Sequence, residues 1–228
     1  APYGVRLDAA QVLPDAIFRG DAYVQDEASQ ICIAALDPRE GDRVLDACSC
    51  PGTKAFSAAM RMKNTGEILA CDKHASKLSL IETSAARLGI NIITARERDS
   101  SVPDATLDES FDRVLCDVPC SGFGVIAKKP EIRYKSISDF TELDTIQKNI
   151  LEESAKYVKV GGTLLYSTCT LRKAENEERV LNFLENNKNF ELTPFKVGSI
   201  SAENGFITLF PCEKGTDGFF IAKLKRIL

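Results

Sequence analysis

Short apolar runs alternate with longer amphipathic stretches along most of this chain. The apolar runs lie at residues 43–47, 66–71, 90–95, 114–116 and 163–167. Helix-like patterns occupy residues 25–36, 55–62, 74–88, 138–157 and 174–186. Strands that alternate with helices join into parallel sheets, because each crossover returns the chain to the same end of the sheet. The pattern therefore predicts an α/β fold with a mostly parallel central sheet and helices on both faces.

The two ends of the chain depart from this alternation. Strand patterns at 205–210 and 218–224 predict an antiparallel hairpin at one edge of the sheet, and Phe190 and Leu192 mark a further short strand. Residues 160–162 (VGG) predict a turn before the strand at 163–167. We expect residues 1–24 to form a lead-in segment that packs on the edge of a single domain at 25–228.

Composition limits the class of protein. The chain has 228 residues, of which 44% are hydrophobic and 27% charged, as expected for one sizeable α/β domain. No apolar run approaches the roughly 20 residues that a membrane helix needs. The N-terminus lacks a signal-peptide pattern, and the absence of Met at position 1 suggests a fragment of a longer protein. A net charge of −4 argues against strong binding to nucleic acid regardless of sequence. A local basic patch is still compatible with this net charge.

Eight cysteines are many for a chain without an export signal. Cys32, Cys71 and Cys116 fall in or beside apolar runs, where small core residues are the ordinary interpretation. The sequence has no CxxC motif and a single histidine, His74, so we expect no metal. A reducing compartment, the cytoplasm, fits this cysteine usage.

Acids and small residues follow the first strands of the predicted sheet. A loop after the first strand is rich in small side chains and leads into a helix: Cys48, Ser49, Cys50, Pro51, Gly52, Thr53 and Lys54. Such a loop lets a ligand approach the backbone and the free N–H groups of a helix start, although a plain strand-to-helix turn is the alternative. Asp72 ends the second strand, where a carboxylate can accept hydrogen bonds from ribose hydroxyls. Asp99 follows the third strand and, taken alone, is an ordinary surface acid.

Two thiols lie at the ends of two further strands. In FDRVLCDVPCSG (111–122), Asp117 ends the apolar run and Cys120 follows, whereas Cys169 comes just after the strand at 163–167. Ligands of open α/β sheets bind outside the carboxyl ends of the strands, so these residues belong near a site. From spacing alone, inert buried cysteines are the competing interpretation.

A basic cluster follows, with Phe123 and Tyr134 interleaved, and consists of Lys128, Lys129, Arg133 and Lys135. Lysine and arginine pair with phosphates and bases stack on aromatic rings, so the cluster is a candidate RNA contact. A solvated loop explains it equally well.

Five separate motifs together resemble those of the NOL1/NOP2/Sun family of RNA cytosine-C5 methyltransferases, and the bacterial Sun (Fmu) enzymes of small-subunit ribosomal RNA look most similar. The motifs are VQDEASQ (24–30), DACSCPGTK (46–54), DVPCSG (117–122), YSTCTL (166–171) followed by Glu175-Asn176, and DGFFIAKL (217–224). The chain departs from the family pattern at Ser49-Cys50, at Thr53 and at Ala55. We expect Thr53 to affect cofactor affinity, because its side chain stands where backbone approaches the ligand.

The resemblance implies a Rossmann-like class I fold that uses S-adenosylmethionine. Residues 48–54 would wrap the methionine part of the cofactor, Asp72 the ribose and Asp99 the adenine edge, and Asp117 would lie between cofactor and base. It also implies that Cys169 attacks C6 of the cytosine, that a protonated Asp117 donates to N3, and that Cys120 serves elimination. The family's N-terminal domain, similar to NusB, is not part of this sequence.

The resemblance further implies ribosomal RNA, 16S in particular, as the partner of a monomer that binds neither metal nor membrane. A transfer RNA methyltransferase of the same family is the alternative. Two rivals of other classes are a nicotinamide-dependent oxidoreductase and a non-catalytic RNA-binding module. The sequence lacks the GxGxxG motif that the first class would use, and neither class explains two thiols at strand ends.

Overall fold

The fold is described from a computed structural model, which covers residues 4, 13–136, 140–211 and 215–228. Within these residues, one eight-stranded sheet has the order β3-β2-β1-β4-β5-β10-β6, and β9 also pairs with β10. The strands are β1 (Arg43–Asp46), β2 (Glu67–Asp72), β3 (Ile93–Glu97), β4 (Phe111–Asp117), β5 (Val158–Thr168), β6 (Phe190–Leu192), β9 (Phe206–Leu209) and β10 (Phe219–Arg226). The pairs from β3 to β5 are parallel, as the alternating pattern predicted.

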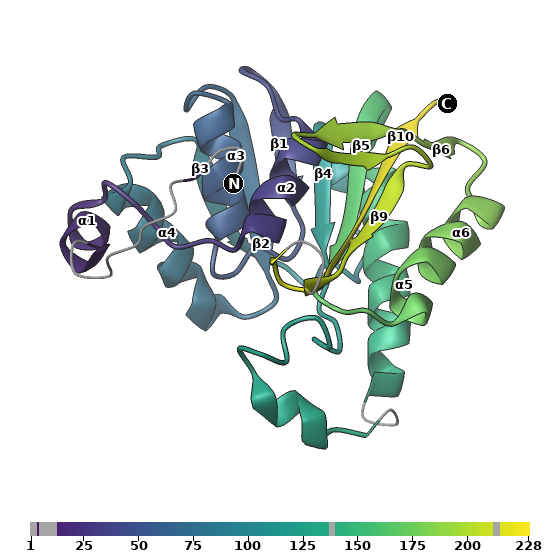
Figure 1. The fold of residues 1–228 in the computed structure, drawn as a ribbon. Helices are drawn as coiled ribbons and strands as arrows, with labels where there is room; N and C mark the ends of the chain where they lie inside the picture. Colours follow the sequence, from purple (N-terminus) through teal and green to yellow (C-terminus); the bar gives the residue numbers. More distant parts are fainter. Residues whose placement is uncertain (1–3, 5–12, 137–139, 212–214) are drawn as a thin grey trace.

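Helices cover both faces of the sheet. They are α1 (Leu13–Arg19), α2 (Glu27–Leu36), α3 (Thr53–Arg61), α4 (Leu78–Arg87), α5 (Thr141–Lys156) and α6 (Glu177–Asn186), with short 3₁₀ turns η1 (Ala75–Lys77), η2 (Ala105–Leu107), η3 (Pro130–Tyr134) and η5 (Lys173–Glu175). Figure 1 shows α3 and α4 on one side and α5 and α6 on the other. Successive side chains of a strand point to opposite faces, so Leu115 packs with α2 to α4 while Val114 and Cys116 pack with α5 and α6.

The strand order reverses between β1 and β4, and this reversal places the site. The chain turns to opposite sides after β1 and after β4, which opens a crevice at the carboxyl ends of these strands. The register aligns Asp46 with Leu115 and Asp117 with Ser167, so the acids that end β1 and β4 reach the same edge. The segment around η3, after β4, projects beyond this edge at the bottom of Figure 1.

The closing strands refine the sequence prediction. β9 and β10 form the predicted antiparallel pair, but β10 lies inside the sheet, antiparallel to β5 on one side and to β6 and β9 on the other. The turn predicted at 160–162 is instead part of β5, where the register with β4 shifts and Gly161 takes a positive φ of 81°. A separate hairpin, β7 (Phe195–Val197) with β8 (Ile200–Ala202), was not predicted, because three-residue strands carry too little alternation.

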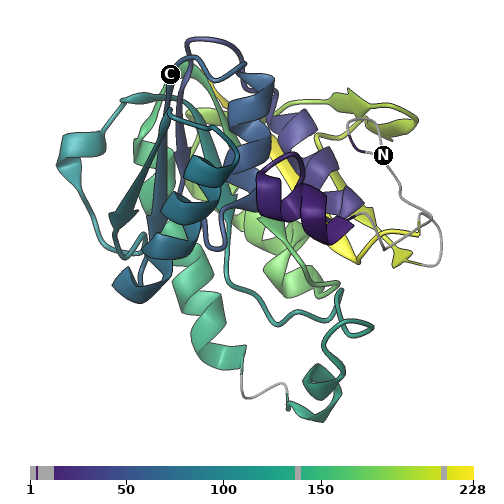
Figure 2. The same ribbon diagram turned by 90° about the vertical axis from the view of Figure 1, so that its left-hand side faces the viewer.

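The helix ends follow from local chemistry. The Asp26 side chain caps α2 by accepting from the Ala28 N–H at 2.9 Å, and Asp37 ends the helix in the left-handed region with φ 53°. In the lead-in segment, α1 lies against α4, because Arg87 donates to the carbonyl oxygens of Ile17 and Ala22 (Figure 2). The predicted helix cap at Ser138-Asp139 lies outside the described residues. Within them, we find no helix long and apolar enough to cross a membrane.

Gly124 and Gly218 provide a test of this packing. A Cβ on Gly124 would meet the Gly218 carbonyl oxygen at 1.9 Å and the Cys169 carbonyl oxygen at 2.8 Å, both rigid backbone atoms. We expect Gly124→Ala to lower the free energy of unfolding by about 3 kcal/mol. At Gly41 nothing lies within 4 Å of the added Cβ, but φ is +85°. Gly41→Ala should therefore lower the free energy of unfolding by only about 1 kcal/mol, through backbone strain. Chemical denaturation measures both, and an equal or smaller loss at Gly124 would contradict the packing described.

Candidate active site

The loop after β1 is shaped to receive a ligand at the start of α3. The Ser49 N–H donates to the Cys71 carbonyl oxygen at 2.7 Å, and the Gly52 N–H donates to that of Ser49 at 2.7 Å. Gly52 precedes the helix with φ 101°, a conformation that other residues rarely adopt. The loop therefore turns tightly, and the free N–H groups of α3 face the crevice edge of the sheet.

Asp46, which ends β1, is a buried acid without a partner. Asp46 is only 2% exposed, and neither of its carboxylate oxygens has a hydrogen-bond partner among the described residues. The Ser49 hydroxyl is also buried and unpartnered. Burial raises the pKa of Asp46 to about 7, against the weaker opposite effect of the nearby Ser49 hydroxyl and Cys48 N–H, which lie outside good hydrogen-bond geometry. An orphaned carboxyl beside a small-residue loop suits a ligand cation, since an unpaired buried acid is otherwise costly.

Asp46 is not among the predicted cofactor-binding residues, the first of which is Cys48. The signal was available, because Asp46 ends the first predicted strand just as Asp72 and Asp117 end theirs. What the sequence did not reveal is that this acid, unlike the other two, forms no ion pair with any residue that the structure describes.

The next two strands place Asp72 and Asp99 beside this loop. Asp72 accepts the His74 N–H at 2.9 Å and lies 3.7 Å from the Lys77 ammonium. Asp99 pairs with Lys73 at 2.7 Å and accepts from Ser101, and these hydrogen bonds lower the pKa of Asp99 to about 2. Because β2 and β3 are parallel neighbours, Asp72 at the end of β2 and Asp99 just after β3 lie at the same edge of the sheet.

Lys54 and Asp117 form an ion pair across the crevice. The Lys54 ammonium donates to Asp117 Oδ2 at 2.6 Å, and the Ser167 hydroxyl donates to Oδ1 at 2.8 Å. Burial alone would lower the pKa of Lys54, but the charge of Asp117 outweighs it and raises that pKa. Both Asp117 oxygens thus act as acceptors, one from an ammonium and one from a hydroxyl. Lys54, which the sequence predicts as a residue of the cofactor loop, thus also contacts the acid that ends β4.

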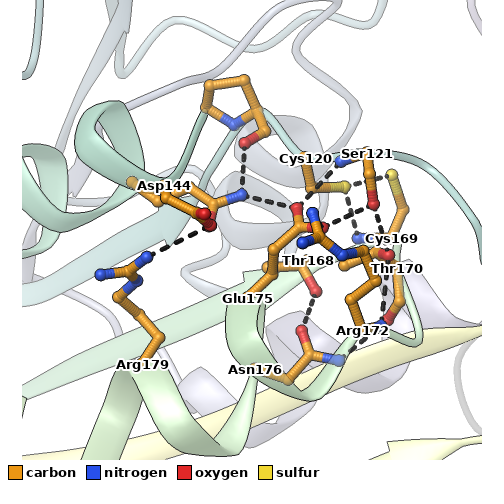
Figure 3. Close-up of polar contacts among 12 residues, drawn as sticks. Cys120, Ser121, Asp144, Thr168, Cys169, Thr170, Arg172, Glu175, Asn176 and Arg179 are labelled. Carbon is orange, nitrogen blue, oxygen red and sulfur yellow. Dashed lines mark hydrogen bonds and ion pairs between the residues drawn. The ribbon is translucent and has the colours of Figure 1, made fainter. Parts of the chain in front are cut away.

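The two thiols meet at the ends of β4 and β5. Cys120 Sγ lies 2.9 Å from Cys169 Sγ, and the Cys169 N–H donates to Cys120 Sγ at 3.2 Å (Figure 3). Both residues are half-buried, and all seven cysteines among the described residues are free. The structure thus brings together the two cysteines that the sequence placed at separate strand ends.

The contact gives the two thiols different acidities. A hydrogen bond from the Cys120 thiol lowers the pKa of Cys169 by stabilising its thiolate, and the charge on Lys54 acts in the same direction. The same bond, together with burial, raises the pKa of Cys120 well above its usual range. Cys169 is therefore the better nucleophile and Cys120 the better proton carrier.

The structure separates the predicted basic cluster into two parts. Lys128 forms ion pairs with Asp26 at 2.9 Å and Asp217 at 2.6 Å, so it joins the loop to both ends of the domain. Three members lie farther along the projecting segment around η3: Lys129, Arg133 and Lys135. All three are exposed, and Tyr134 beside them is 91% exposed.

The strand order and the crevice are those of a class I methyltransferase, which confirms the predicted fold. Residues 33–225 match the family model described as 16S rRNA methyltransferase RsmB/F. The chain belongs to this family, which confirms the resemblance drawn from the motifs.

Proteins with similar sequences are named as ribosomal RNA methyltransferases. The chain is 42% identical over 216 residues to the probable ribosomal RNA small subunit methyltransferase B of Bacillus subtilis, which covers 91% of this chain and 48% of that protein. It is 33% identical over 214 residues to ribosomal RNA small subunit methyltransferase F of Citrobacter koseri, covering 90% of this chain and 44% of the relative. The chain thus spans about half the length of the curated relatives it matches.

Solved structures show the same fold. NSun6 from Pyrococcus horikoshii, solved with SFG, matches with a TM-score of 0.84 and 28% identity over 96% of this chain and 57% of its own. A methyltransferase homologue protein from the same organism matches with a TM-score of 0.81 and 29% identity, covering 97% of this chain and 73% of the other.

The orphaned carboxyl of Asp46 predicts a pH-dependent stability. Its pKa is raised in the folded protein, so the contribution to stability is fully present below the unfolded pKa near 4 and is lost as pH rises through about 7. Asp46→Asn removes this loss. Between pH 5 and pH 8 the difference in unfolding free energy should move in favour of the variant by about 2–3 kcal/mol. Denaturant titrations across this range measure it, and a difference independent of pH would show that Asp46 is not a buried titrating acid.

The thiol contact predicts how Cys169 reacts with an alkylating reagent. Cys120→Ala removes the hydrogen bond that stabilises the Cys169 thiolate, so the pKa of Cys169 should rise. The pH profile of Cys169 alkylation by iodoacetamide, read by peptide mass spectrometry, should move to higher pH in the variant. Cys50, which lies in the loop after β1, serves as the internal control with an unchanged profile. A Cys169 profile that stays in place would mean that Cys120 does not tune its partner.

Proposed function

We propose that this chain transfers a methyl group from S-adenosylmethionine to C5 of a cytosine in small-subunit ribosomal RNA, through a covalent bond between Cys169 and C6. The observation that carries the proposal is the pair of thiols at 2.9 Å, beside the Lys54–Asp117 ion pair. Membership of the RsmB/F family and the names of the relatives support this substrate.

The residues around β1 fit the cofactor. The orphaned Asp46 carboxylate suits its ammonium group, residues 48–54 its methionine part, Asp72 the ribose hydroxyls and Asp99 the adenine edge. A neighbour solved with SFG, an analogue of S-adenosylmethionine, supports S-adenosylmethionine as the cofactor. When bound, the cofactor supplies an electrophilic methyl group on a sulfonium centre.

The first step uses Cys169 and the Lys54–Asp117 pair. Cytosine C5 is a weak nucleophile until a thiolate adds at C6, so Cys169 forms the S–C6 bond and C5 becomes enamine-like. Negative charge then develops toward N3. Asp117 accepts from Lys54 and lies at the mouth of the crevice, so the pair passes a proton from the ammonium through the carboxyl to N3. C5 takes the methyl group, and the sulfonium sulfur keeps the electron pair of the broken bond.

The second step releases the product and uses Cys120. Once Cys169 sulfur is bonded to carbon, its negative charge is gone, and the largest of the factors that raised the pKa of Cys120 is removed. Cys120 can then give its proton to water and take the proton from C5. The C5–H electrons form the C5–C6 double bond, the C6–S bond breaks, and the Cys169 thiolate is restored. The proton on N3 returns through Asp117 to Lys54, which restores the ion pair.

The target base has to leave its stack to reach this crevice. The projecting segment around η3 lies at the same edge of the sheet (Figure 1). It carries an exposed aromatic ring among exposed cations. We propose that Lys129, Arg133 and Lys135 contact phosphates there, while Lys128 holds the loop in place. A second candidate class, the non-catalytic RNA-binding module, leaves the paired thiols unexplained.

The two cysteines should fail in opposite ways. Cys169→Ser removes the nucleophile, so methyl transfer to 16S ribosomal RNA should vanish without any covalent complex. Cys120→Ser should still attack and transfer the methyl group, then stall as a protein–RNA adduct. A denaturing gel with labelled RNA reads both results, and binding of S-adenosylmethionine to each variant controls for folding. A band shift in neither variant, with methylation retained in both, would remove the covalent mechanism.

A further inference from the structure

A single buried carboxylate joins the two loops that carry the thiols. Glu175, in η5, is fully buried, and each of its oxygens accepts two hydrogen bonds (Figure 3). Oε1 accepts from the Ser121 hydroxyl at 2.6 Å and from Arg172 at 2.9 Å. Oε2 accepts from the Ser121 N–H at 2.9 Å and from the Gln147 amide at 2.8 Å. Four donors satisfy the carboxylate, so the charge is held without any contact to a sulfur atom.

These bonds fix the neighbours of Cys120. Ser121 follows Cys120 directly and is bound to Glu175 through both its backbone and its side chain. Gln147, from α5, also donates to the carbonyl oxygen of Pro119 at 3.0 Å, on the other side of Cys120. The residues before and after the thiol are therefore held by one connected network, and Glu175 is the acceptor at its centre.

The next residue, Asn176, does the same for Cys169. Its Oδ1 accepts from the Thr168 hydroxyl at 2.6 Å, and its Nδ2 donates to the Thr170 carbonyl oxygen at 3.0 Å. Thr168 and Thr170 are the two neighbours of Cys169. Besides the thiol contact, a further link joins the loops, because the Ser121 and Thr170 hydroxyls lie 2.7 Å apart. Glu175 and Asn176 thus hold different loops although they are adjacent in the chain.

We propose that Glu175 is a positioning residue for Cys120 and that Asn176 is a positioning residue for Cys169, so that each serves a different step of the reaction. The inference rests on the proposed function. Glu175 should matter for elimination, when Cys120 must reach the C5 proton, and Asn176 for attack, when Cys169 must reach C6. Misplacement of a reacting group by about 1 Å costs up to roughly 100-fold in rate, so either residue can act without touching the substrate.

Two RNA probes separate the steps. Unmodified 16S ribosomal RNA allows the complete reaction, and its covalent adduct accumulates only when elimination is slow. The same RNA with 5-fluorocytosine has no proton to lose at C5, so its adduct forms at a rate set by attack and methyl transfer alone. Both adducts are measured by denaturing gel with S-adenosylmethionine present.

Glu175→Gln replaces one acceptor oxygen with a donor that faces other donors, while keeping the side-chain shape. It should slow turnover about 10- to 100-fold on unmodified RNA, with a visible adduct, and leave the rate on fluorinated RNA within about threefold of wild type. Asn176→Ala should slow adduct formation on fluorinated RNA about 10-fold or more and accumulate no adduct on unmodified RNA. Glu178→Gln makes the same change at an exposed position three residues away and should match wild type in both assays.

Each outcome decides the proposal. If Glu175→Gln slows both steps equally, or neither, the division of roles is overturned. If Glu175→Gln fails to bind S-adenosylmethionine, Ser121→Ala serves in its place, because it removes only the hydroxyl donor. Ser121→Ala should still accumulate adduct, to a smaller extent than Glu175→Gln would. If no adduct accumulates in Ser121→Ala, the proposal is overturned. Cys120→Ser is the reference in the same assay. If it traps adduct while Glu175→Gln and Ser121→Ala do not, only the positioning role fails, whereas no adduct from any variant defeats the covalent mechanism and the inference with it.

Discussion

The hydrogen bond between the two thiols is the contact on which the account depends. Two sulfur atoms remain within 2.9 Å only if their loops are held from both sides, and β4 and β5 supply the first constraint because they are parallel neighbours that end at the same edge. The second constraint is the buried network of Glu175, Asn176 and Gln147. A shared proton then gives the two thiols different roles. It stabilises the thiolate of Cys169, and it stays on Cys120 until Cys169 has reacted.

The acids of the crevice differ in what satisfies them. Asp99 and Asp117 have lysine partners inside the chain, so their charges are already compensated. Asp46 is the exception, because its buried oxygens have no partner in the described residues. An ion pair organises the protein before any ligand arrives, whereas an orphaned acid gains its partner only on binding. The part of the crevice beside β1 therefore suits a cationic ligand, and the part beside β4 suits proton transfer.

The sequence predicted most of the elements that position this site, and the missing parts have physical causes. Parallel strands ending in Asp46, Asp72 and Asp117 follow from periodicity, and the motifs around Cys120 and Cys169 indicated the family. The role of Glu175 was hidden, because its partners Ser121 and Gln147 lie 54 and 28 residues away along the chain. Lys128 belonged to a basic cluster by spacing, yet its charge is used by Asp26 and Asp217 from the two ends of the domain. Long-range pairing of this kind leaves no periodic trace.

The identity of the sulfur atom that bonds to the base tests the central claim most directly. After reaction with S-adenosylmethionine and 16S ribosomal RNA containing 5-fluorocytosine, nuclease and protease digestion leaves one peptide that carries a methylated fluorocytidine. Tandem mass spectrometry then locates the modified residue. The account predicts that the nucleoside is attached to Cys169 in the peptide containing YSTCTL, with Cys120 unmodified. Attachment to Cys120, or to neither cysteine while the RNA is methylated, would contradict it.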